Sequence, residues 1–124
     1  MAHFHLDIIQ PFHAAPTSSN EHTIDFSQRG NNYAITATNA TNTITFSNLG
    51  AGVVGKGGTI LITNPASVGS LGWAALPATA YTPGASTIVF DTTASKIAAL
   101  TYLIVASDKV LMNYVGAFDS YPQP

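Results

Sequence analysis

Histidine offers the most versatile chemistry in this sequence, and there are four: His3, His5, His13 and His22. In an extended strand, the spacing His3-x-His5 places two imidazoles on the same face, close enough to share a metal ion. A third ligand could come from a symmetry-related copy on a three-fold axis, and the chain has no cysteine to supply a thiolate. We therefore expect no metal site and interpret the histidines of the N-terminal arm, residues 1–20, as binding nothing; the shared metal is the alternative.

The glycine-rich segment 50–56, GAGVVGK, matches the letters of two phosphate-binding patterns. A phosphate cradle needs a helix N-terminus directly after the glycines. Here Gly57 and Gly58 lead instead into a β-branched segment, and the Walker pattern would require Ser or Thr at position 57. The sequence indicates an inter-strand loop and no nucleotide cofactor.

Serine, histidine and aspartate all occur, but no serine lies in a G-x-S-x-G elbow. The six carboxylates are isolated in sequence, each beside a turn or a strand end. Carboxylates distant in sequence can still meet as a glycosidase pair, which stays an open alternative. We expect no enzymatic activity and no cofactor.

Two aromatic residues, Trp73 and Tyr81, fall in segments rich in glycine and proline. An aromatic ring in a loop can stack on the face of a sugar, which makes this pair a candidate glycan contact. The alternative for Trp73 is that it fills one end of a hydrophobic core.

Charge is scarce, because only 8% of the 124 residues are charged against roughly 25% in soluble domains. The four basic residues are scattered, so we expect no nucleic-acid partner. The longest apolar run, 97–105, is far below the ~18 residues that span a bilayer, and the N-terminal residues do not resemble a signal peptide. Low charge predicts a surface largely covered by protein; the alternative is a monomer solubilised by Ser, Thr and Asn.

Alternating and β-branched segments predict an all-β chain. Expected strands occupy 23–26, 33–38, 41–46, 59–63, 86–90, 97–105 and 109–115, the last two forming a hairpin and 97–105 lying inside its sheet. Short strands at this spacing are typical of a single antiparallel β-sandwich, jelly-roll-like, or of a barrel, here spanning residues 21–118.

Residues 1–20 differ from the remainder and are interpreted as an N-terminal arm, with an irregular linker at its end; 119–124 are interpreted as a C-terminal tail. The arm could pack on its own domain or on a neighbouring subunit. For the second case the expected contacts are apolar: Phe4, Leu6, Ile8, Ile9 and Phe12.

Five segments taken together resemble a known family: TNTITF at 41–46, GGTILI at 57–62, GSLGW at 69–73, AALTYLIV at 98–105 and VLMNYVG at 110–116. Their order is similar to a small all-β module of tailed-bacteriophage virion proteins, found in head and tail fibres and in capsid decoration proteins. The resemblance implies a trimeric structural module without catalysis. The chain departs from the fibre members because it has no shaft, coiled coil or separate attachment domain.

The leading hypothesis is therefore a homotrimeric capsid decoration (cement) protein, made in the host cytoplasm and placed on the virion surface, with the major capsid protein as partner. The alternative is a fibre-tip or receptor-binding module that touches host glycans through Trp73 and Tyr81. A third class, a free carbohydrate-binding domain, predicts a monomer.

Overall fold

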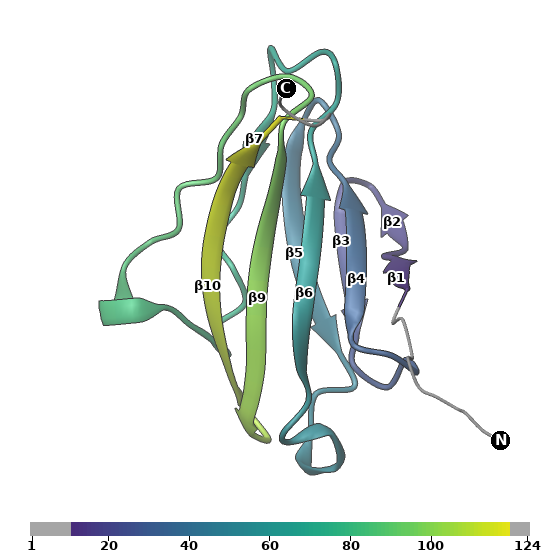
Figure 1. Ribbon diagram of the computed structural model, residues 1–124, viewed down its shortest axis with the longest axis vertical. Coiled ribbons are helices and arrows are strands. Elements are labelled where there is room, and N and C mark those ends of the chain that lie inside the picture. Colours follow the sequence, from purple (N-terminus) through teal and green to yellow (C-terminus); the bar gives the residue numbers. More distant parts are fainter. Residues whose placement is uncertain (1–10, 120–124) are drawn as a thin grey trace, which may run out of the picture.

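The computed structural model describes residues 11–119 as two β-sheets packed face to face. One sheet has six strands in the order β1-β4-β6-β9-β10-β8, and the other has four in the order β2-β3-β5-β7. The strands are β1 (Phe12–Ala14), β2 (Thr17–Ser18), β3 (Glu21–Asp25), β4 (Asn32–Thr36), β5 (Thr41–Ser47), β6 (Gly57–Thr63), β7 (Gly72–Trp73), β8 (Ala80–Tyr81), β9 (Ile97–Ala106) and β10 (Lys109–Phe118). The expected all-β sandwich is confirmed (Figure 1).

The predicted hairpin is confirmed, since β9 and β10 pair antiparallel with Leu103 opposite Leu111. β9 also pairs with β6, so it lies inside its sheet as its apolar sequence indicated. The strand expected at 86–90 is wrong: this segment is irregular. Its alternation has another cause: Ile88 and Phe90 pack against the core while Val89 is 83% exposed, although the segment belongs to no sheet.

The expectation of purely antiparallel sheets is also wrong, because both sheets are mixed. β1 pairs parallel with β4, β4 with β6, β3 with β5, β5 with β7, and β8 with β10. From β3 to β7 the chain changes sheet at every strand. Within this stretch, neighbouring strands of one sheet are therefore separated in sequence by a strand of the other sheet, and they run parallel.

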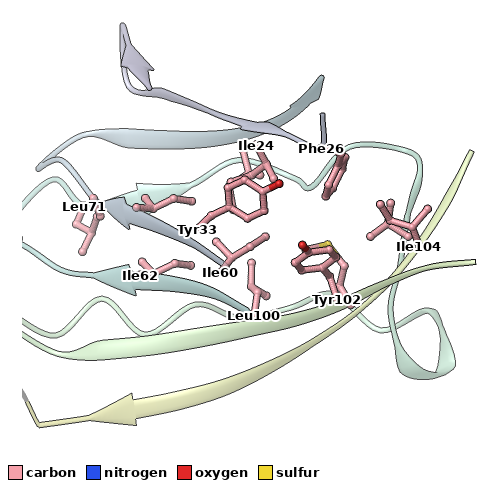
Figure 2. Packing of buried hydrophobic residues seen from close by; sticks show 14 residues of the cluster. Ile24, Phe26, Tyr33, Ile60, Ile62, Leu71, Leu100, Tyr102 and Ile104 are labelled. Atoms are coloured by element: carbon pink, nitrogen blue, oxygen red, sulfur yellow. The ribbon is translucent and has the colours of Figure 1, made fainter. Parts of the chain in front are cut away.

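The core fills the space between the sheets with alternate strand residues, as Figure 2 shows. Ile24 and Ile44 face it from the four-stranded sheet, and Ile60 and Leu100 face it from the six-stranded sheet. All four are at most 2% exposed. Such alternation is what a sheet with one buried face requires.

An aromatic cluster lies within this core. The Phe26 and Tyr102 ring centroids are 5.5 Å apart, and those of Tyr33 and Tyr102 are 6.2 Å apart. The Tyr33 hydroxyl donates to the Asp25 carbonyl at 2.9 Å, and the Tyr102 hydroxyl donates to the Asn31 carbonyl at 2.6 Å. Burial raises the pKa of both phenols, because a charged phenolate would lose its water.

The second half of the expected arm belongs to the sandwich rather than to an irregular linker. β1 pairs with β4, and β2 pairs antiparallel with β3. Phe12, the one expected arm contact within the described residues, lies on β1 and is 47% exposed. The other four, Phe4, Leu6, Ile8 and Ile9, lie outside the described residues, so their contacts stay a prediction, as do those of tail residues 120–124.

Candidate contact surface

The six-stranded sheet buries one side against the four-stranded sheet and turns its other side, called the outer face below, to solvent. Figure 1 looks onto this outer face. It consists of the strand residues that alternate with the buried ones. Most of the large apolar side chains exposed in the described part of the chain lie here, each between 42% and 52% exposed: Phe12, Tyr81, Leu103, Val105, Leu111, Val115 and Phe118. Sheets with one solvated face normally alternate apolar-in with polar-out, so this surface is unusual.

The strand pairings arrange the outer face in rows that cross the strands. One apolar row holds Tyr81, Leu111 and Leu103. A second apolar row runs through Val115, Ala99, Leu61 and Ala34. Between them lies a neutral polar row formed by Asn113, Thr101 and Thr59.

Formal charge is almost absent from this sheet. Lys109, the first residue of β10, is the one Lys, Arg, Asp or Glu among its strand residues. Its Nζ lies 3.5 Å from an Asp108 carboxylate oxygen and 5.9 Å from the Tyr81 ring centroid. Near the opposite end of β9, Lys96 pairs with Asp119. The charges at both ends of the hairpin thus have local partners of opposite sign.

A groove of about 370 Å³ opens on the outer face where β8 meets the hairpin. Its lining includes Tyr81 and Pro83, on β8 and just after it, and Leu103, Leu111 and Asn113 of the hairpin. Its walls are mainly apolar, so it fits an apolar side chain better than a charged group.

The outward side of the four-stranded sheet has the opposite character. It presents Thr23, Thr43 and Thr45 together with the carboxylates of Glu21 and Asp25. The Thr23 and Thr45 hydroxyl oxygens are 3.3 Å apart. Hydrogen bonds from Asn48 and Ser27 lower the pKa of Asp25. This surface is typical of a sheet facing water.

The two aromatic residues proposed as a glycan contact are not brought to one surface. Trp73, on β7, stacks on Phe90 with ring centroids 4.6 Å apart, and lies 5.9 Å from the His22 ring. Phe90 therefore occupies a ring face that a sugar would use. Tyr81 lines the groove on the outer face, whereas Trp73 lines a separate cavity of about 510 Å³ beside Ile88.

A buried polar cluster around His22 and Asn42, each 0% exposed, was missed by the sequence analysis. His22 Nε2 lies 2.8 Å from Asn42 Oδ1, and His22 Nδ1 lies 2.7 Å from the Thr17 hydroxyl. Since Oδ1 only accepts, Nε2 carries the proton. The Asn42 amide donates to the carbonyls of Thr38 at 2.9 Å and Ala40 at 3.0 Å. His22 on β3 thus links Thr17 on β2 to Asn42 on β5. The sequence feature that could have predicted this cluster is Asn42, a polar residue at an inward-facing position of the strand expected at 41–46.

The glycine-rich segment forms the loop between β5 and β6, with a short 3-10 helix η1 (Ala51–Val53), which confirms the inter-strand loop. The Lys56 ammonium donates to the carbonyls of Phe26 and Gln28, each at 2.8 Å. Its Nζ also lies 5.6 Å from the Tyr33 ring centroid. Partial burial lowers the pKa of Lys56. The lysine therefore ties this loop to the turn after β3.

Across residues 11–119, no three His, Asp or Glu residues come together as a potential metal site. His13 lies on β1, while His3 and His5 fall outside the described residues. Over the same range, no helix has the length and apolar character needed to cross a bilayer.

Comparisons with family models, with curated proteins and with solved structures return no match to this chain.

Proposed function

We propose that this chain is a non-enzymatic structural subunit, and more narrowly the homotrimeric decoration protein of a tailed-bacteriophage capsid, bound where major capsid subunits meet. The observation that carries the proposal is the outer face, where half-exposed Leu103, Leu111, Val115 and Phe118 lie on a sheet nearly free of charge. Exposed apolar surface of this extent marks a protein contact. The narrower assignment rests on the sequence resemblance.

Such a protein would stabilise the capsid because the same interface with the major capsid protein is repeated many times over the shell. A standard protein interface buries about 1,600 Å² in total, and many modest contacts acting on one particle reinforce one another. A decoration subunit needs no catalytic group for this, only a stable fold and neutral contact surfaces.

The test is the copy number of the chain in purified virions, measured by quantitative mass spectrometry against the major capsid protein. A decoration protein is expected in hundreds of copies per particle. A handful of copies would contradict the proposal and favour a fibre or tail component.

A second candidate, a fibre-tip module that binds host glycans, is favoured by one observation: half-exposed Tyr81 lies beside an open groove. A glycan array with the purified chain separates the two. A decoration protein should bind no sugar, whereas specific binding that is lost in Tyr81→Ala would establish the glycan module.

A further inference from the structure

We infer that the outer face of the six-stranded sheet is covered by a second copy of this chain. This inference rests on the proposed structural function and goes further, because it assigns one surface and one partner to the contact between subunits.

The first argument is the difference between the two outward sides. If neutral polar residues simply replaced charge to keep a monomer soluble, both sheets would present Ser, Thr and Asn to water. The four-stranded sheet does so, with Thr23, Thr43 and Thr45 facing outward. The six-stranded sheet, besides its polar row, also exposes Leu103 and Leu111, each by 45%. Only one side of the sandwich therefore has the composition of a contact surface.

The second argument is area. β9 and β10 have ten residues each, and at ~3.3 Å per residue they are about 33 Å long. Four strands, β4, β6, β9 and β10, at ~4.8 Å spacing are about 19 Å wide. β4 and β6 are shorter, with five and seven residues, so the four strands cover roughly 500 Å² before the short edge strands are added. This is the larger part of the ~800 Å² that each partner contributes to a standard stable interface.

The third argument is charge. A charged partner would need complementary charges on this face, and the sheet offers only Lys109, which already lies near Asp108 and Tyr81. A copy of the same neutral face meets no unpaired charge there. The polar row of Thr101 and Asn113 is likewise uncharged, so a neutral surface of a neighbouring copy can cover it without burying a charge.

The experiment compares Thr101→Glu with Thr41→Glu. Both threonines are exposed and outward-facing, Thr101 at the centre of the outer face on β9 and Thr41 at the start of β5 in the other sheet. The added carboxylate and the lost side chain are therefore the same. Light scattering and analytical ultracentrifugation at two concentrations would report the mass, and circular dichroism would report the fold.

We expect the unchanged chain and Thr41→Glu to form the same oligomer. Thr101→Glu should raise its dissociation constant by about 100-fold or more, because the interface would bury like charges against each other. Leu111→Glu, at the rim of the groove, is a second variant in case Thr101→Glu fails to fold, and the same weakening is expected.

Two results would overturn the inference: an unchanged chain that stays monomeric at all concentrations, or an oligomer that folded Thr101→Glu and Leu111→Glu leave intact. Neither result touches the copy number in virions, which tests the proposed function. A chain abundant on capsids but monomeric in solution would place a capsid subunit on this face. If the chain forms the oligomer but is absent from virions, the proposed decoration function is wrong and the proposed contact between copies stands.

Discussion

Asn42 makes several polar contacts in the interior of the described chain. Its side-chain amide donates to the carbonyls of Thr38 and Ala40, and its Oδ1 accepts from His22 Nε2 and from the Thr38 backbone N–H. Each of these four hydrogen bonds is 3.0 Å or shorter. A buried group that loses its partner costs more than an average hydrogen bond contributes.

Asn42→Ala should therefore lower the free energy of unfolding by about 2–4 kcal/mol, because it strands the buried His22 Nε2 proton and two carbonyls. Urea denaturation measures this. Asn113→Ala, on the exposed outer face, is the control, with an expected change within about 0.5 kcal/mol at concentrations where the chain is monomeric. Equal losses in both variants would contradict a structural role for the cluster.

Tyr33 and Tyr102 set a limit to stability at high pH. Burial raises the pKa of both phenols above their ordinary 10.0. A raised pKa favours the protonated, folded state, so this stabilisation is complete below pH 10 and is lost as the pH rises further.

An alkaline titration followed by tyrosinate absorbance should show a part of the five tyrosines ionising only together with unfolding. In Tyr102→Phe, that cooperative part should shrink. Smooth ionisation of all five near pH 10, with near-ultraviolet circular dichroism unchanged, would contradict the buried environment.

Much of what individual residues do could be predicted from the sequence, but only where the local pattern decides it. Gly57, at the position of the Walker serine, led to the prediction of an inter-strand loop at 50–56, and that loop is confirmed. The roles of Lys56 and His22 could not be predicted, because their partners Phe26 and Asn42 are 30 and 20 residues away. Hydrogen bonds over such separations depend on strand pairing, which the sequence pattern does not determine.

At the scale of elements, β6 and the turn before β4 approach too closely for a side chain. A Cβ on Gly58 would lie 2.1 Å from the Asn31 carbonyl oxygen, the same oxygen that accepts the Tyr102 hydroxyl. Asn31 has to move if Gly58 carries a side chain, and a core hydrogen bond is then disturbed.

Gly58→Ala should lower the free energy of unfolding by about 2–4 kcal/mol, as an overpacked backbone contact with a broken hydrogen bond. Gly72→Ala is the matched control, since a methyl group on this strand glycine would meet nothing within 4 Å beyond its chain neighbours. Thermal and urea unfolding of both variants measure the difference. Equal stability of the two variants would show that the turn at Asn31 can move without a cost in free energy.

The strands themselves were largely predictable, and their partners were not. Alternation located β3, β4 and β5, because one buried face leaves its period in the sequence. Apolar and β-branched runs located β6, β9 and β10. The two-residue strands β2, β7 and β8 are too short to have a period. The parallel pairings escaped prediction because they follow from the chain changing sheets, and no local pattern records that.

At the scale of the whole molecule, the near absence of charge on the outer face determines how salt should affect association between copies. Association through a neutral apolar surface has no ion pairs for salt to screen. Composition predicted that a covered surface exists, but only the register of β9 and β10 shows which surface could be the covered one.

Self-association should therefore change by less than about three-fold between 50 and 500 mM NaCl, and any change should be a slight strengthening. Sedimentation at several salt concentrations measures this. A steep weakening with salt would mean that charged residues away from the outer face, such as Glu21 and Arg29, hold the subunits together.

The alternation of the chain between its two layers also bears on how the protein folds and resists force. Among the described residues, only the β9–β10 hairpin joins long strands that are adjacent in sequence, so we expect it to form first. The short β2–β3 pair also closes a tight turn, whereas the other pairings of long strands close longer loops and should form more slowly. Once formed, β3 to β7 interlace the layers, and neither sheet can peel away without drawing strands out of the other. We therefore expect β3 to β7 to open together, rather than one sheet at a time, under a pulling force or a protease.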